Sequence, residues 1–313
     1  MSKINCWIIS DNLIGHEKQS ISLAEKLNTN YRLIKIKKTN FIKRNFLRFL
    51  DFKKTEFNPP YPKIIISCGK STAYYAKLIK EKTKNKIFSI FIQKPPISLN
   101  NFDIVVSPRH DRCKGANVIQ THGALTKINK EFIKKINKKK TPNILKEKYV
   151  VALIGGNSRH HKITKKILDK IINSLSIIEE KIKIIVLVSR RTKKKDYLYL
   201  KNKLKTKNFI FILPNSKKLT YLDAISFAKA IIVTSDSVSM VTEACSSGKP
   251  TYIIDIPTKS KRFSLFIKNL IDLKLAYYFK DSISLKRKNK ALNDIDVVVK
   301  RIKRRMKGRY ENL

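Results

Sequence analysis

Residues 231–250 read IIVTSDSVSMVTEACSSGKP and contain the clearest indication of the fold. The apolar start of this stretch predicts a buried strand. The polar residues 235–237 then supply side-chain oxygens that cap a helix, Gly248 ends that helix, and Pro250 opens a second strand. A strand, a helix and another strand in so short a stretch are typical of the βαβ unit of a parallel sheet.

The same alternation extends outward from this unit in both directions. Residues 63–67 (KIIIS) lead into a helical pattern at 71–82, and residues 149–154 (YVVALI) lead into another at 162–178. Strands that are apolar on both sides predict a parallel sheet covered by helices on both faces. We therefore predict an α/β fold.

A charged segment at 137–148 interrupts the alternation and is interpreted as a linker. The chain has 313 residues, which is enough for two domains. We predict two Rossmann-like parallel-sheet domains that face a cleft, at 1–140 and 141–290, followed by a last helix within 291–313. Open sheets of this kind bind ligands at the carboxyl ends of their strands.

The composition limits the class of protein. The chain has 69 Lys and Arg against 23 Asp and Glu, a formal net charge of +46. This excess indicates a phosphate-bearing partner, such as nucleic acid or an anionic membrane. The alternative is that it reflects only A/T-rich codons, which favour lysine over other residues. Nucleic acid is the weaker alternative because lysines are spread over the whole chain and neither an RNA-binding signature nor a zinc finger is present.

Cysteine usage and hydropathy indicate the compartment. The four cysteines stand singly, which favours buried thiols over disulfides or a metal site. Neither a signal peptide nor an apolar run of about 18 residues is present. We expect a soluble cytosolic protein.

A glycine-rich loop follows the strand at 149–154, where the sequence reads GGNSRHH. Glycines let the backbone approach a ligand closely, and a helix N-terminus offers N–H groups to phosphate oxygens. The loop matches neither common nucleotide-binding motif, so a simple turn remains the alternative. The adjacent His160 and His161 diverge on a helix, which predicts no metal site there.

Two further strand ends carry charged side chains. Ser189, Arg190 and Arg191 follow the strand within 184–192 (IIVLVSRRT), where an arginine pair suits a diphosphate or is merely solvated. Glu243 projects from the helix after 235–237, where a carboxylate suits sugar hydroxyls but is also common on a surface.

In the first half, SDNLIGHEKQS (10–20) and PRHD (108–111) follow strands. His16, His110 and Asp111 are the candidates for a general base, at the ends of strands that we expect to be neighbours. A merely polar surface is the alternative.

Taken in order, five motifs resemble the mitochondrial-fission "elongated mitochondria" family of plants and bacteria. They are SDxxxGHExQS, FDxVVxPxHD, GGxSRH, SRRT and TxDSVSMVxEAxxxGKP, and the resemblance runs from about Lys3 to Phe279. The chain departs from the family at Asn12-Leu13, where Gly-Lys is expected, and at Lys94, where an acidic residue is expected.

The resemblance implies a GT-B glycosyltransferase-like fold whose last helix crosses back to the first domain. It is similar to the transferase that adds N-acetylglucosamine in peptidoglycan lipid synthesis. It implies a second domain that holds a nucleotide-sugar, which is a co-substrate, with neither a metal nor a cofactor. The implied donor-binding residues are Gly155, Gly156, Asn157, Ser158, Arg159, Ser189, Arg190, Ser235, Asp236, Ser237, Ser239, Met240 and Glu243. The first domain holds the acceptor, with Asp11, Gly15, Gln19 and Gly69 on the acceptor side.

We therefore expect transfer of a sugar from a nucleotide donor to a cell-envelope glycolipid, such as the lipopolysaccharide core, at the cytoplasmic face of the inner membrane. His16 or His110 takes the acceptor proton, and Asp111 orients His110. The rivals are a non-catalytic scaffold, since plant members are associated with recruiting a dynamin-like protein, and a nucleic-acid binder. The oligomeric state is left open.

A membrane surface has separate support in residues 40–54 (NFIKRNFLRFLDFKK), which mix aromatic and basic side chains. Such a segment suits docking on anionic lipid. A core helix of the first domain is the equal alternative.

Overall fold

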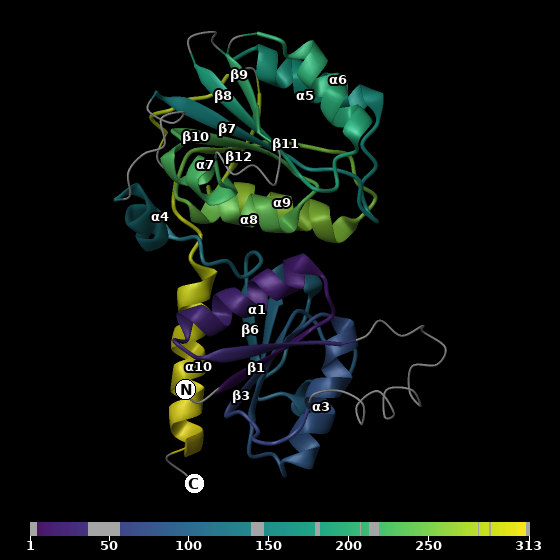
Figure 1. Cartoon of the computed structure of the whole chain (residues 1–313), viewed down its shortest axis with the longest axis vertical. Helices are drawn as coiled ribbons and strands as arrows, with labels where there is room; N and C mark the ends of the chain where they lie inside the picture. Colours follow the sequence, from purple (N-terminus) through teal and green to yellow (C-terminus); the bar gives the residue numbers. More distant parts are fainter. Residues whose placement is uncertain are drawn as a thin grey trace. The chain divides into compact units, whose positions relative to one another are not determined.

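Two six-stranded parallel sheets, each in its own compact unit, make up the chain (Figure 1). The computed structural model describes residues 5–36, 57–138, 147–178, 182–206, 208–212, 219–280, 282–287 and 289–310. The first unit comprises Met1–Lys127 with Asp294–Leu313, and the second comprises Ile128–Asn293. The predicted α/β class with two Rossmann-like sheets is confirmed.

In the first unit the strand order is β2-β1-β3-β4-β5-β6, and every neighbouring pair is parallel. The order reverses between β1 and β3, which makes their carboxyl ends the topological switch point where such sheets bind ligands. The strands are β1 (Cys6–Ser10), β2 (Tyr31–Lys35), β3 (Ile64–Cys68), β4 (Phe88–Ile92), β5 (Ile104–Pro108) and β6 (Val118–Thr121).

Helices cover both faces of this sheet because its central strands are apolar on both sides. Helices α1 (Ile14–Lys26) and α10 (Asp294–Tyr310) pack on one face, and α3 (Ala73–Lys82) packs on the other. Short 3-10 turns follow or precede the strands at η2 (Lys70–Thr72), η3 (Leu99–Asn101) and η4 (Arg109–Asp111).

The second unit has the strand order β12-β11-β10-β7-β8-β9, again parallel throughout. This is the Rossmann order, with its switch point between β7 and β10. The strands are β7 (Tyr149–Ile154), β8 (Lys183–Val188), β9 (Phe209–Ile212), β10 (Ala230–Thr234), β11 (Thr251–Ile254) and β12 (Tyr277–Tyr278).

Two layers of helices enclose that sheet (Figure 1). Helices α5 (Lys165–Ser176) and α6 (Lys194–Lys203) pack on one face. Helices α7 (Tyr221–Phe227), α8 (Val238–Ser246) and α9 (Lys261–Asp272) pack on the other.

The unit boundary lies earlier than the linker composition indicates. Helix α4 (Lys130–Asn137) is capped by Asn129, whose Oδ1 accepts a hydrogen bond from the Phe132 N–H at 2.8 Å. Ile133 of this helix joins the second unit's core, so the division falls after Lys127 rather than after residue 140. Most of the predicted linker, residues 139–146, lies outside the described residues, as do residues 40–54.

The last helix returns to the first unit, as predicted. Ile295, Val298 and Ile302 of α10 join the core cluster that contains Leu23 of α1. At the start of α10, Asp294 Oδ2 accepts hydrogen bonds from the backbone N–H groups of His122 and Gly123, at 2.8 and 2.9 Å. The carboxylate therefore ties the helix to the loop after β6.

Replacing Asp294 with Ala is expected to lower the free energy of unfolding by about 1 to 3 kcal/mol, because two backbone N–H groups lose their acceptor. Asp296→Ala is the control, since its 2.7 Å ion pair with Lys26 is partly exposed and contributes less than about 1 kcal/mol. Urea unfolding followed by circular dichroism measures both. Equal losses of unfolding free energy in the two variants would contradict a stabilising role for the two hydrogen bonds that Asp294 accepts.

Candidate functional site

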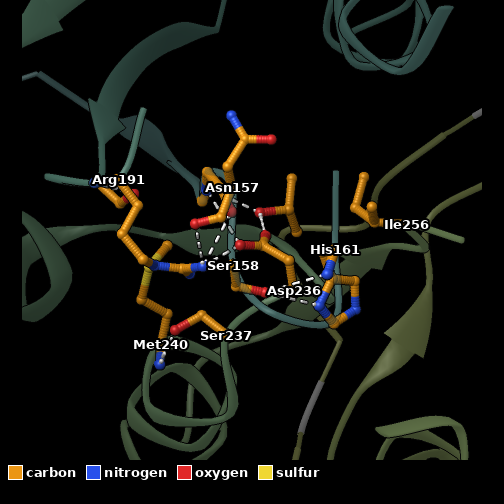
Figure 2. A network of polar contacts seen from close by, with 12 residues as sticks. Asn157, Ser158, His161, Arg191, Asp236, Ser237, Met240 and Ile256 are labelled. Atoms are coloured by element: carbon orange, nitrogen blue, oxygen red, sulfur yellow. Dashed lines mark hydrogen bonds and ion pairs between the residues drawn. The ribbon is translucent and has the colours of Figure 1, made fainter. Parts of the chain in front are cut away.

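The carboxyl ends of β7 and β10 bring the two conspicuous loops of the second unit together (Figure 2). Gly155 and Gly156 follow β7, and Ser235 and Asp236 follow β10. Both loops therefore lie at the switch point of the Rossmann sheet, where this fold places its ligand.

Asp236 is the centre of the polar network at this point. Its side chain is 0% exposed and forms an ion pair with Arg191, with Oδ2 to Nη2 at 2.8 Å. The same oxygen accepts the Gly156 N–H at 3.0 Å, and Oδ1 accepts the Thr234 hydroxyl at 2.6 Å. A buried carboxylate is tolerable only when it is paired and hydrogen-bonded in this way.

Side chains from the loop after β8 hold the glycine loop from its other side. Arg191 Nη1 donates to the carbonyls of Gly156 and Asn157, at 2.9 and 3.2 Å. Thr192 Oγ1 donates to the Gly155 carbonyl at 2.8 Å. The Ser189 hydroxyl accepts the Arg191 N–H at 3.1 Å and so shapes the turn that presents the arginine.

The arginine in this network is Arg191, whereas the family resemblance implied Arg190, whose role toward a diphosphate stays a prediction. Arg190 is exposed. The SRRT motif indicated an arginine at the strand end, but only the turn geometry decides which of the two points toward the glycine loop. Thr192 and Thr234, which complete the network, were also missed because single threonines carry no distinctive signal.

The two glycines are required by the protein's own packing. A Cβ on Gly155 would overlap the Asp236 carboxylate, and a Cβ on Gly156 would overlap the backbone of Arg191. Their N–H groups donate to the Thr234 hydroxyl at 2.8 Å and to Asp236. A role for these glycines toward a diphosphate stays a prediction.

The rest of this loop folds tightly on itself. Ser158 Oγ accepts the N–H groups of His160 and His161, at 3.2 and 3.1 Å, and Asn157 Oδ1 accepts the Ile163 N–H at 2.9 Å. Arg159, next to them, is exposed.

His161 turns inward and His160 outward. His161 is 1% exposed, its ring meets Phe263 edge-on at 4.6 Å, and burial lowers its pKa from 6.5. Its Nε2 has no hydrogen-bond partner among the residues that the structure describes. Within the same residues, no three His, Cys, Asp or Glu side chains gather closely enough to share a metal ion.

Helix α8 carries the remaining donor-side residues. Ser237 caps it by accepting the Met240 N–H at 3.4 Å, and Ser237, Ser239 and Met240 are all half-buried in its first turn. Ser235 is buried and links two strand ends, since its hydroxyl donates to Asp255 at 3.0 Å and accepts the Ile256 N–H at 2.8 Å.

Glu243 is buried one turn further along α8. The Tyr221 hydroxyl of α7 donates to Glu243 Oε2 at 2.6 Å, and burial together with this carboxylate raises the Tyr221 pKa well above its ordinary value. Glu243 is therefore held in a fixed orientation instead of extending from the surface.

In the first unit, Asp11 and His16 form a pair at the switch point between β1 and β3. His16 Nδ1 lies 2.9 Å from Asp11 Oδ2, and the His16 side chain is 21% exposed. Gly69, with φ of +93°, lies against the pair, where a Cβ would come within 2.5 Å of His16 Nδ1. With its Nδ1 proton held by Asp11, His16 presents Nε2 as a proton acceptor.

The other histidine lies elsewhere on the same sheet edge. We expected His16 and His110 at neighbouring strands, and this is wrong, because β3 and β4 lie between β1 and β5. Three strand spacings separate the two positions by about 14 Å. His110 is buried, with its Nε2 3.7 Å from Asp111 Oδ1.

Of the acceptor-side residues, Gln19 has a clear local role. Gln19 is buried, donating to the Gly15 carbonyl at 3.2 Å and accepting the Leu125 N–H at 3.2 Å. Gly15 is exposed. Asn12, where the family resemblance predicts Gly, has φ of +64°, a conformation that Asn tolerates better than most residues.

The model of the family described as Mitochondrial fission ELM1 matches residues 14–306. The chain belongs to this family. The resemblance predicted from the motifs is thereby confirmed.

Two relatives give this ELM1-family chain its context. The uncharacterized protein RP120 of Rickettsia prowazekii (strain Madrid E) is 29% identical, over 90% of this chain and 92% of that protein. The mitochondrial fission protein ELM1 of Arabidopsis thaliana is 26% identical, over 79% of this chain and 65% of that protein.

Solved structures show the fold. The UDP-GlcNAc 2-epimerase of Methanocaldococcus jannaschii has a TM-score of 0.56 at 16% identity, over 97% of this chain and 99% of that chain. MurG of Acinetobacter baumannii has a TM-score of 0.53 at 12% identity, over 96% and 99%. The ELM1-family chain thus has the GT-B type of fold, found in glycosyltransferases and epimerases.

Gly155→Ala or Gly156→Ala is expected to destabilise the protein by about 1 to 3 kcal/mol, because the added methyl group overlaps Asp236 or the backbone of Arg191. Gly308→Ala is the control, since its Cβ meets nothing within 4 Å and Ala favours a helix. Thermal unfolding distinguishes them. Tolerance of both loop substitutions would contradict the packing described here.

Stability is expected to fall as the pH drops below about 6.5, since the unfolded chain binds a proton at His161 more tightly than the folded chain. His161→Gln should flatten this dependence, whereas His160→Gln, at the exposed neighbour, should keep it. Urea unfolding from about pH 8 to about pH 5 measures the slope. If the dependence of stability on pH is unchanged in His161→Gln, His161 is not the group that causes it.

Proposed function

We propose that this protein binds a nucleotide-sugar in its second unit and transfers the sugar to a cell-envelope glycolipid. The observation that carries the proposal is the position of Arg191 at the Rossmann switch point. Its bonds to Gly156, Asn157 and Asp236 use three of its five N–H donors, and its side chain is 36% exposed. The remaining donors suit the oxygens of a diphosphate.

The start of α8 supports the same donor site. Its N-terminus follows β10 at the switch point, where helix N–H groups favour negative charge. Tyr221 fixes the orientation of Glu243, whose carboxylate we assign to the sugar-nucleotide hydroxyls. A solved structural neighbour, the M. jannaschii epimerase, is described in complex with UDP-GlcNAc and UDP.

In the reaction, the acceptor hydroxyl attacks the anomeric carbon of the donor sugar. The bond from that carbon to the diphosphate breaks, and the nucleoside diphosphate leaves with the electron pair. Arg191 and the α8 N-terminus stabilise the charge that develops on it. His16 Nε2 takes the proton from the attacking hydroxyl, and Asp11 stabilises the resulting imidazolium.

The acceptor class is proposed from the family resemblance and the charge. A net charge of +46 favours work at an anionic membrane surface, and we propose the cytoplasmic face of the membrane. In the described part of the chain, no helix is long and apolar enough to cross a bilayer.

The test is a thermal-shift panel of nucleotides and nucleotide-sugars, followed by titration calorimetry with the best ligand. Glu243→Gln is expected to weaken binding about tenfold or more, because a charged acceptor is lost. Tyr221→Phe is the comparison variant, since it keeps the carboxylate and removes only the hydrogen bond that orients it, and a smaller loss of affinity is expected. His16→Gln should keep donor binding and abolish transfer.

Each other outcome has a definite meaning. If the protein converts a nucleotide-sugar to its epimer in the absence of an acceptor, its activity is epimerisation and the proposed sugar transfer is wrong. A folded protein that binds no nucleotide-sugar would overturn the proposal in favour of a non-catalytic fission-type scaffold.

A further inference from the structure

A pocket in the first unit lies away from the Asp11–His16 pair. It has a volume of about 890 Å³ and opens beside α10 at the amino ends of β4, β5 and β6. Strands of five residues put this edge about 15 Å from the carboxyl ends. The pocket is lined by Lys80, Phe88, Leu99, Asn100, Phe102, Asp103, Gly115, Ala116, Asn117, Arg301, Arg304, Arg305 and Gly308.

Three arginines of α10 form one wall. Arg301, Arg304 and Arg305 are spaced three and four residues apart, so they share a face of the helix. All three are exposed, and no carboxylate in the described ranges pairs with them. Gly308 continues this face without a side chain, where even a Cβ would meet nothing within 4 Å.

A largely buried ion pair fixes another part of the lining. Lys80 Nζ of α3 lies 3.1 Å from Asp103 Oδ2, and that oxygen also accepts the backbone N–H and the hydroxyl of Ser89, at 2.7 and 2.9 Å. Asp103 is thus already satisfied, and its charge offsets that of Lys80. The three arginines remain, so the pocket has a net charge of three positive units.

The pocket also has apolar surface. Phe88, Leu99 and Phe102 contribute to its lining. A volume near 890 Å³ is typical of sites for organic ligands and is far larger than one inorganic anion requires.

We propose that this pocket binds a ligand with a phosphate group joined to an apolar body. Arginine suits phosphate because its planar guanidinium donates two parallel hydrogen bonds. The apolar lining takes the organic part of the ligand. This chemistry is shared by the head group of an anionic lipid and by a free phosphorylated compound. The site is independent of the donor site proposed above.

The experiment measures binding of octyl phosphate by titration calorimetry, and of phosphatidylcholine vesicles with and without phosphatidylglycerol by co-sedimentation. The pocket variant carries Arg301→Gln, Arg304→Gln and Arg305→Gln. The matched control carries Lys300→Gln, Lys303→Gln and Lys307→Gln, which removes the same charge from exposed positions of α10 outside the pocket lining. Circular dichroism confirms that both variants fold.

The pocket variant is expected to lose more than about tenfold in affinity for octyl phosphate, whereas the control stays within about threefold. A selective loss of binding to phosphatidylglycerol vesicles in the pocket variant identifies a lipid head group as the source. If the pocket variant loses binding of octyl phosphate but binds vesicles as the wild type does, the ligand is a free phosphorylated compound. Equal losses in both variants, or no binding by the wild type, would overturn the proposal.

Discussion

The candidate donor site depends on one buried carboxylate. Asp236 lies at the carboxyl end of β10 and holds three elements at once: the glycine loop after β7, Arg191 after β8 and its own strand end through Thr234. Because its side chain is fully buried, each of these partners is obligatory. The shape of the switch point is therefore set before any ligand arrives, which lowers the entropic cost of binding.

The architecture was predictable because both sheets are parallel and buried. Their strands are apolar runs such as residues 63–67, so the alternation of strands and helices alone indicates two Rossmann-like sheets. Some of the helices between them also have a capping side chain, for example Thr164, Thr220 and Ser237. The boundary was not predictable from composition. Helix α4 precedes the charged linker, yet its apolar face fits the core of the second unit, and that choice depends on packing instead of local sequence.

The sequence was sufficient to predict which loops form the site, but not which side chains within them contact one another. The resemblance implied that Gly155 and Asp236 both belong to the donor side, and the carboxyl ends of the neighbouring strands β7 and β10 bring them together. The choice of Arg191 over Arg190, and the pairing of His16 with Asp11, depend on the geometry of turns. The separation of His16 from His110 depends on strand order, which chain order does not reveal.

The return of α10 to the first unit has a consequence for the nascent chain. The ribosome makes this helix only after the whole second unit. Until then, one face of the first sheet lacks Ile295, Val298 and Ile302 and leaves apolar surface around Leu23 in water. Exposed apolar surface of this kind attracts chaperones and promotes aggregation. The helix that closes the first unit is thus the last of that unit's elements to be synthesised.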